Sequence, residues 1–266
     1  FHTDSCITIS NIQTVKNHGM ALAKDYGMVI MDEVHHLPAE TFKQTIDRLK
    51  CRYKIGLSGT LRRKDQKHVL LYDYLSNKVF VPPKENVIDP VIKVFNSACE
   101  LPAPRAPWAN RVTALLNSPD FIHEVVSLAD AQAKRGHKVL VVGDRIDFLY
   151  TCTDILDDSA VCITSRTKNQ KDLEKQVLSG EKPILFGTTS IFKEGISINP
   201  LSCLILASPI NNESLLEQLC GRIMRIHEGK LDPEVIDIKL KGGTGYNQFK
   251  TRMSFYLSEN WKVVEI

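Results

Sequence analysis

The sequence predicts an α/β protein with two parallel-sheet domains in tandem. Short apolar runs alternate with amphipathic stretches of helical length along the chain. Most runs are apolar almost throughout, which is typical of strands buried on both faces by helices. At 266 residues, the chain is long enough for two domains of ordinary size.

The pattern predicts the elements in order. In the first part we expect strands at residues 6–10, 28–32, 53–57 and 78–81, and helices at residues 15–23 and 39–49. In the second part we expect strands at residues 138–143, 160–163, 183–188, 203–207 and 234–240, and helices at residues 121–135, 146–156, 170–179 and 214–224. The segment "CELPAPRAPWAN" carries three prolines, so we expect domain one at residues 1–98, a linker at 99–109 and domain two at 110–266.

Composition restricts the class of protein. Hydrophobic residues make up 43% and charged residues 24%, a globular balance, and the net charge of +3 permits binding to a polyanion without requiring it. Seven scattered cysteines with no CxxC pair predict reduced thiols, not a disulfide framework or zinc site. We see no membrane-length apolar run and no signal peptide. We therefore expect a cytoplasmic or nucleoid-associated protein (nuclear in a eukaryote), not a secreted one. Since the first residue is Phe1, we also expect a fragment.

The stretch "MVIMDEVHHL" places two acids at the end of an expected strand. Chemistry in α/β sheets concentrates at the carboxyl ends of strands. Asp32 there can hold Mg²⁺ against nucleotide phosphates. Glu33 can orient or deprotonate a water for attack on the γ-phosphate. The alternative is that the pair only caps the next helix.

Ser58, Gly59 and Thr60 form a small-residue turn after the next expected strand. The hydroxyls of Ser58 and Thr60 can reach the acids and pass changes at the phosphate to the other domain. Without the acidic pair one strand earlier, the same three residues would indicate an ordinary turn. His35 and His36 are adjacent on a loop with no partner at ligand spacing, so a metal site is not expected there.

Gln218, Arg222 and Arg225 are spaced i, i+4 and i+7, so in a helix they share one face. Guanidinium groups stay charged and bind phosphate oxygens bidentately. An arginine of this kind contributes about 10³–10⁵ to the rate of phosphoryl transfer. The alternative is a solvated basic helix end.

Hydroxyl groups at the end of the strand 183–188 suit contacts with a nucleic-acid backbone, because Thr188, Thr189 and Ser190 follow one another there. Four aromatic residues near the end of the chain either stack on bases or belong to the core: Tyr246, Phe249, Tyr256 and Trp261.

DEVH followed by SGT resembles motifs II and III of the superfamily 2 helicases. Four further stretches, in the order of the family, resemble motifs Ib, IV, V and VI: "ITISNIQTV", "KVLVVGDRIDFL", "ILFGTTSIFKEGISI" and "QLCGRIMR". Within the family, "SGTLRRKDQKHVLLYDYL" and "YNQFKTRMSFYLSENWKV" are most similar to the XPB and phage UvsW group of double-stranded-DNA translocases and branch-remodelling helicases.

The resemblance implies two RecA-like domains that bind ATP and Mg²⁺ between them. The implied catalytic or nucleotide-binding residues are Asp32 (through Mg²⁺), Glu33, Gly195, Gln218, Arg222 and Arg225. The implied coupling residues are His35, Ser58 and Thr60. The implied nucleic-acid contacts are Gln13, Thr14, Thr164, Arg166, Thr188 and Thr189, although a plain loop at residues 163–170 stays open. Ser197 stands where many relatives carry a ribose-binding Asp, so that contact is not implied.

A P-loop of the form G-x-x-x-x-G-K-[ST] is missing from the sequence. In the family it precedes DExH by more than the 31 residues available here. We therefore expect the first domain to be incomplete, with sheet edge and apolar surface exposed. We expect the chain alone to hydrolyse ATP poorly or not at all, as a truncated or split helicase or one whose P-loop comes from another polypeptide.

The sequence thus favours an ATP-dependent helicase or translocase acting on double-stranded or branched DNA, with RNA less favoured by the resemblance. One alternative is a non-catalytic DNA-binding or assembly module that keeps only the nucleic-acid contacts. Another is the motor part of a restriction system, which would need a nuclease motif in an adjoining segment.

Overall fold

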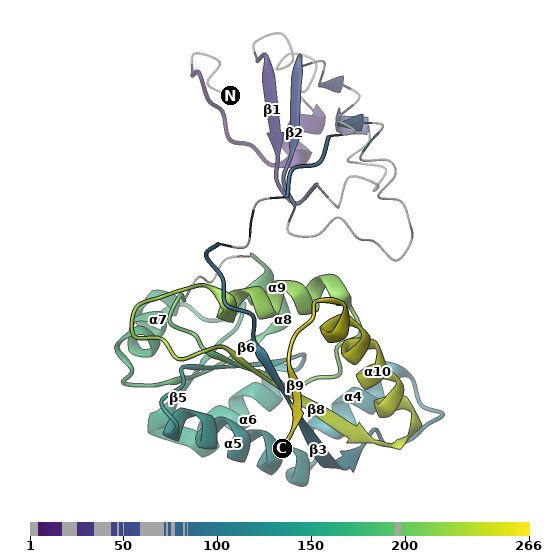
Figure 1. The fold of residues 1–266 in the computed structure, drawn as a ribbon, viewed down its shortest axis with the longest axis vertical. Helices are drawn as coiled ribbons and strands as arrows, with labels where there is room; N and C mark the ends of the chain where they lie inside the picture. Colours follow the sequence, from purple (N-terminus) through teal and green to yellow (C-terminus); the bar gives the residue numbers. More distant parts are fainter. Residues whose placement is uncertain are drawn as a thin grey trace. The chain divides into compact units, whose positions relative to one another are not determined.

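A computed structural model describes most of the second half of the chain and parts of the first. The described residues are 5–17, 26–34, 44–46, 48–49, 51–58, 72, 74–75, 78–81, 83, 85–194 and 198–266, without the side chains of 192–194. The chain divides into two compact units, Phe1–Pro83 and Lys84–Ile266. Each unit has its own parallel sheet (Figure 1).

The first unit contains β1 (Met28–Met31) and β2 (Tyr53–Gly56), which pair in parallel with Met28 opposite Tyr53. Its small core has Met31, Val34 and Ile46 at its centre. Four apolar side chains of the two strands are 41–58% exposed: Met28, Ile30, Tyr53 and Ile55. The described part of this sheet is therefore covered incompletely, as the sequence predicts for the first domain.

The second unit is built on seven parallel strands in the order β5-β6-β4-β7-β8-β3-β9. The strands are β3 (Val91–Glu100), β4 (Val139–Gly143), β5 (Ala160–Ile163), β6 (Ile184–Thr188), β7 (Cys203–Leu206), β8 (Glu234–Lys241) and β9 (Val263–Glu265). The four strands β4–β7 are buried along almost their whole length, because helices cover both faces of the sheet.

Two apolar clusters, one on each face, hold these helices to the sheet. The helices are α4 (Trp108–Leu116), α5 (Pro119–Lys134), α6 (Ile146–Leu156), the short 3₁₀ helix η2 (Asp157–Ser159), α7 (Gln170–Ser179), α8 (Thr189–Glu194), α9 (Glu213–Met224) and α10 (Gly242–Ser258). Buried residues of α4, α5 and α6 join one cluster, and those of α7, α9 and α10 join the other. In Figure 1, α5 and α6 accordingly lie on the opposite side of the sheet from α8 and α9.

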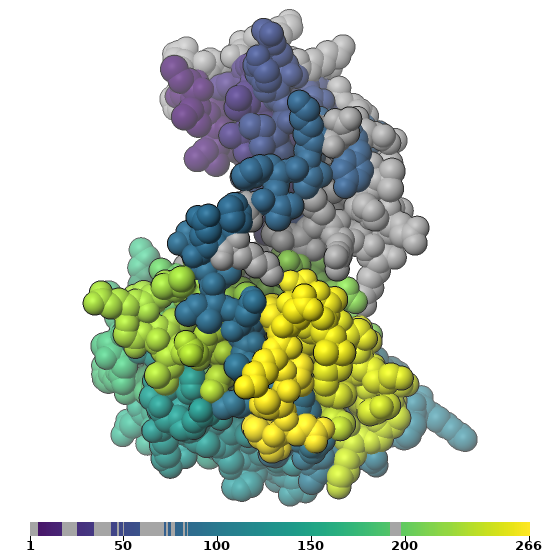
Figure 2. Space-filling view, in the orientation of Figure 1, coloured from purple at the N-terminus to yellow at the C-terminus, as the bar shows by residue number. Residues whose placement is uncertain are grey.

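The predicted domain boundary differs from the structure at one strand. Residues 91–98, assigned to the first domain, belong to β3, which lies in the second sheet between β8 and β9. Figure 2 shows the blue β3 segment beside the yellow C-terminal residues. The expected linker is a loop of the second unit, because the Arg111 side chain donates to the backbone oxygens of Leu101 and Pro102. The proline-rich stretch therefore joins β3 to α4.

Several predicted elements are confirmed and two are wrong. The strands expected at 28–32, 53–57, 138–143, 160–163, 183–188, 203–207 and 234–240 are present to within two residues at either end, as are the four helices expected in the second part. Residues 6–10 and 78–81 form no strand; Ile9 and Phe80 are 97% and 84% exposed and gain no burial from a sheet. The helix expected at 15–23 is described only to residue 17, and much of the one at 39–49 lies outside the described residues.

A buried ion pair ties α10 to β8. Arg252 donates from Nε and Nη2 to both carboxylate oxygens of Asp237, at 2.8 and 2.6 Å, and the Tyr256 hydroxyl donates to the same carboxylate. Phe249, Tyr256 and Trp261 are buried, which confirms the core interpretation for them, whereas Tyr246 is 49% exposed. Among the described helices, we find none with the length and apolar character needed to cross a membrane.

Candidate active site and nucleic-acid interface

The acidic pair follows β1 directly, and backbone bonds hold it against the end of β2. The amide of Leu57 donates to Met31 O at 2.8 Å, and the amide of Val34 donates to Leu57 O at 2.9 Å. Asp32 and Glu33 therefore sit in a turn closed on both sides by Leu57. Ser58 is the next residue, so its backbone follows directly after the residue that closes the acidic turn; the predicted reach of its hydroxyl to the acids stays a prediction.

The turn itself is tight. Glu33 has a φ of +49°, in the left-handed region that few side chains adopt, and its amide donates to Asp32 Oδ1 at 2.8 Å. Asp32 is exposed. A solvent-facing carboxylate with one oxygen engaged fits Mg²⁺, which prefers one or two carboxylates together with water and phosphate oxygens. No cluster of three or more metal-ligating side chains occurs among the described residues.

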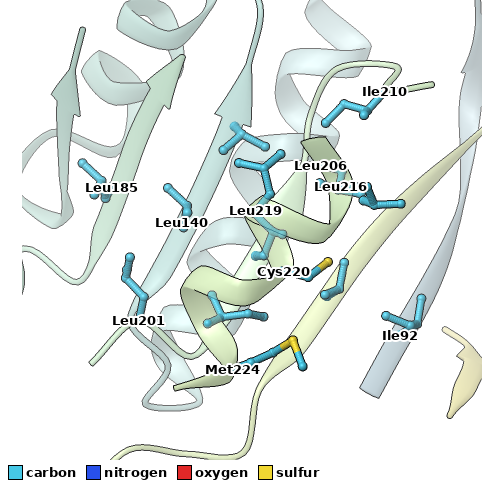
Figure 3. Close-up of a cluster of buried hydrophobic side chains, with 14 of the residues drawn as sticks. Ile92, Leu140, Leu185, Leu201, Leu206, Ile210, Leu216, Leu219, Cys220 and Met224 are labelled. Carbon is cyan, nitrogen blue, oxygen red and sulfur yellow. The ribbon is translucent and has the colours of Figure 1, made fainter. Parts of the chain in front are cut away.

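The sequence of α9 fixes which side of the helix faces solvent. Leu216, Leu219, Cys220, Ile223 and Met224 are buried at i, i+3, i+4, i+7 and i+8, and Figure 3 shows four of them over the sheet near Leu140 and Leu206. The Asn212 side chain accepts from the Leu215 amide at 3.2 Å and caps the start of the helix. Gln218 and Arg222 consequently lie on the other side, half-buried and four residues apart.

Arg225, which we predicted on one helical face with Gln218 and Arg222, is the C-cap residue of α9. The helix ends at Met224, and Arg225 is an extended residue that pairs with Val87 in an isolated antiparallel bridge. The flanking backbone bonds join Ile88 N–H to Met224 O and Ile226 N–H to Asn86 O. These pairings replace the next helical turn, and Arg225 Nη1 donates to Asn199 Oδ1 at 3.3 Å.

The arginines lie at the edge of the sheet where strands begin, because α9 runs back from the end of β7 to the start of β8. Asn199, Lys230 and the 86–88 segment also meet Arg225 here. Sequence reasoning missed all three, and no pattern in the sequence marks them.

A hydroxyl cluster occupies the opposite edge, where strands end. Thr188 is paired with Gly143 in the sheet, so Thr188 and Thr189 lie beside Asp144. Thr189 Oγ1 donates to Asp144 Oδ1 at 3.3 Å, and Thr188 Oγ1 lies 3.1 Å from Ser190 Oγ. Burial raises the pKa of Asp144, although the Thr189 bond lowers it in part. The order of the strands therefore collects the predicted backbone-binding hydroxyls at one edge.

Thr164 also reaches this edge, but its side chain is only 1% exposed. Its hydroxyl accepts from the Arg166 amide at 3.2 Å and lies 3.3 Å from the Tyr150 hydroxyl. Ser165 and Arg166, which follow it in the turn, are both exposed. Thr164 thus shapes the turn, and of the two residues predicted here to contact nucleic acid, only Arg166 is exposed to solvent.

In the first unit, Gln13 and Thr14 lie in the helical residues 12–17. Asn11 caps this helix, because its Oδ1 accepts from the Thr14 amide at 2.9 Å and from the Thr14 hydroxyl at 2.7 Å. Gln13 is exposed, whereas the Thr14 hydroxyl is already engaged. His35, Thr60 and Gly195, and with them His36 and Ser197, lie outside the described residues.

Comparison with protein families finds a match in each of the two units. Residues 1–63 match the res subunit of Type III restriction enzymes, and residues 119–227 match the helicase conserved C-terminal domain. The chain is 43% identical to the probable helicase D10 of Escherichia phage T5, over 99% of this chain and 60% of that protein.

More distant relatives lie in the predicted subgroup. The ATP-dependent DNA helicase uvsW of Enterobacteria phage T4 is 20% identical over 96% of this chain and 54% of its own length. The DNA 3'-5' helicase XPB of Kineococcus radiotolerans is 26% identical over 60% of this chain and 30% of its own length. The crystal structure of T4 UvsW aligns with a TM-score of 0.56 at 19% identity, over 96% of this chain and 56% of that one. The chain therefore spans about a third to three fifths of these relatives.

Proposed function

The chain belongs to the superfamily 2 helicases of the XPB and UvsW kind, and on this premise we propose that it is the motor segment of an ATP-dependent DNA helicase or translocase. The observation that carries the proposal is the arrangement at the end of α9. Arg222 lies half-buried on its solvent side, and Arg225 is held beside it by backbone pairing. Guanidinium groups kept in fixed places are suited to stabilising charge that develops on a transferring phosphoryl group.

In this proposal Asp32 holds Mg²⁺ with the phosphates, and Glu33 orients the attacking water. When bound, Mg²⁺ neutralises charge on the β- and γ-oxygens. Gln218, Arg222 and Arg225 act on the same nucleotide, and we extend this to Gly195. Ser58, whose backbone adjoins the acidic turn, passes changes at the phosphate onward with His35 and Thr60.

The nucleic-acid contacts we propose are Thr188, Thr189 and Arg166 at the carboxyl edge of the second sheet, with Gln13 in the first unit. Neutral hydroxyl groups and one exposed arginine position a phosphate backbone without reading its sequence. DNA is the substrate we favour, since the UvsW and XPB relatives are named as DNA helicases.

We further propose that another polypeptide segment, carrying the P-loop, covers β1 and β2. The exposed apolar side chains of Met28, Ile30, Tyr53 and Ile55 support this, because an exposed sheet of this kind offers both apolar area and backbone groups for pairing. Such a segment would also supply the phosphate cradle that the sequence lacks.

The test measures DNA-stimulated ATP hydrolysis by the chain alone and by the chain supplied with a P-loop segment from a superfamily 2 relative. We expect no turnover by the chain alone and clear turnover by the supplemented chain. In the latter, Arg222→Ala should lower kcat by about 10³-fold. The control is Arg105→Ala, an exposed arginine in the loop before α4, which should leave kcat unchanged. Failure of the supplemented chain to hydrolyse ATP would refute the motor function.

A non-catalytic DNA-binding module is the second candidate. Under it, the chain would bind DNA with an affinity that falls steeply with salt and is the same with and without ATP and Mg²⁺. The match of residues 1–63 to a restriction-enzyme subunit favours a third, a restriction motor, which requires a nuclease in an adjoining segment.

A further inference from the structure

A lysine that belongs to none of the motifs grips the end of α9. The Lys230 ammonium donates to Ile223 O and to Arg225 O, at 2.6 Å each. The last carbonyls of a helix have no partner within the helix, so an ammonium group there satisfies acceptors that would otherwise depend on water. Lys230 is half-buried, and it binds one carbonyl inside the helix and one beyond its end.

The chain segment 86–88 also binds the end of α9, through backbone hydrogen bonds. Its backbone bonds to Met224 and Ile226 are 2.8 and 3.3 Å long and flank Arg225. Lys230 takes the remaining backbone oxygen, that of Arg225 itself. The backbone of Arg225 is thus fixed through both neighbours and through its own carbonyl. Asn199 receives the guanidinium at 3.3 Å.

The position of Lys230 is electrostatically unfavourable to the lysine. Burial, and then the charge of Arg225, lower the pKa of Lys230 to about 8. The two carbonyl oxygens and the negative end of the helix dipole offset part of this cost. Lys230 is therefore held at this position by its two hydrogen bonds to the end of the helix, since solvation alone would favour a more exposed ammonium group.

We propose that Lys230 is a positioning residue for Arg222 and Arg225: its ammonium group locks the end of α9 in the form that pairs with residues 86–88. This rests on the proposed function, in which the two arginines act on ATP. A displacement of about 1 Å in a charged group at the reacting centre costs up to a hundredfold in rate, so loosening this lock should lower kcat.

The first measurement needs no enzymatic activity. Amide hydrogen exchange is measured in the full chain and in Lys230→Met, which keeps the aliphatic stem and removes the charge. We expect exchange of the Ile88 and Ile226 amides to accelerate by about tenfold, because their bonds depend on the locked helix end. In Lys230→Arg, which restores a donor and a charge, exchange should return to within about twofold of the wild type.

A matched control comes from a second lysine with the same chemistry. Lys138 donates from Nζ to Leu178 O, near the end of α7. Lys138→Met should accelerate exchange of the Gly180 amide and leave Ile88 and Ile226 unchanged. Unchanged exchange at Ile88 and Ile226 in Lys230→Met overturns the proposal. Uniform acceleration over the whole second unit also overturns it, since that indicates general destabilisation.

The second measurement uses the chain supplied with a P-loop segment. Lys230→Met should lower kcat by about 10- to 100-fold and change the KM for ATP by less than about twofold, whereas Lys230→Arg should recover most of kcat. A kcat equal to that of the wild type overturns the positioning role. If the supplemented wild-type chain hydrolyses no ATP, the proposed function fails, and the exchange experiment still decides the role of Lys230.

Discussion

The two units use the same strand chemistry with different results. In the second unit, β4 has neighbours on both sides and helices on both faces, so Leu140 and Val141 are fully buried. In the first unit, β1 and β2 have only each other among the described residues, and Ile30 is 58% exposed. Apolar content alone therefore does not make a core; the number of pairing partners decides how much apolar area leaves the water.

The candidate catalytic groups of the two units also differ in how much structure supports them. The acidic turn of the first unit is closed by two backbone bonds at Leu57, on a sheet of two strands. In the second unit, Arg222 lies on α9 and Arg225 directly follows its end, and this helix buries five side chains in one of the two apolar clusters. We expect the guanidinium groups to be preorganised and the carboxylates to depend on whatever covers β1 and β2.

The comparison is sharpened most strongly by breaking the buried ion pair of the second unit. Arg252→Met leaves the Asp237 carboxylate buried without its cation, which should lower the free energy of unfolding by about 3–5 kcal/mol. Urea unfolding followed by tryptophan fluorescence measures this, because Trp108 and Trp261 both belong to the second unit. The double variant Asp237→Asn, Arg252→Met should recover part of the loss. If Arg252→Met were as stable as the wild type, the buried Arg252–Asp237 pair would not stabilise the second unit, which contradicts this prediction.

The first unit should not respond to that change. Exchange of the Leu57 amide, which closes the acidic turn, is expected to stay the same in Arg252→Met, as two compact units with separate cores predict.

Much of the second unit was predictable because the sequences of its buried strands are apolar almost throughout. The run "VLVVG" is apolar up to its final glycine, and "CLIL" is apolar throughout. Each is a fully buried strand in the structure. β3 was not predicted as a strand, and its residues 91–98 were assigned to the wrong domain, for a physical reason. Its partner residues, such as Glu234 opposite Val91, are more than a hundred positions away, and a proline-rich stretch follows it.

The place of a candidate site residue was predictable where it followed from a predicted element. Thr188 lies at the end of a strand and Arg222 on a helix, as the pattern predicts, whereas their roles stay predictions. Arg225 was expected on the helix and lies beyond it, since the bridge to Val87 depends on backbone pairing between distant segments. Lys230 was not found at all, because a single lysine in "HEGKLD" carries no spacing signal. Contacts made by the folded backbone are invisible to periodicity.

A matched pair of core truncations tests the comparison more directly. Leu185→Ala in β6 removes a fully buried side chain and should cost about 2–5 kcal/mol of unfolding free energy, measured by tryptophan fluorescence in urea. Ile55→Ala in β2 removes a side chain that is 41% exposed and should cost less than about 1 kcal/mol, measured by exchange of the Leu57 amide. Equal costs at the two sites would break the comparison, because they would mean that β2 is buried in solution.

The smallest expected effect tests whether the loss of unfolding free energy on substitution depends on burial of the side chain or only on its being in the second unit. Lys134 pairs with Asp130 at 2.6 Å on α5, but its side chain is 75% exposed. Such i, i+4 pairs contribute about 0.3–0.5 kcal/mol, since water screens the attraction and ordering the side chains costs entropy. Lys134→Met, which keeps helix propensity, should therefore lower the unfolding free energy by no more than about 0.5 kcal/mol, with the difference vanishing in 1 M salt. If it instead cost as much as Leu185→Ala, stability would follow the unit rather than the buried area.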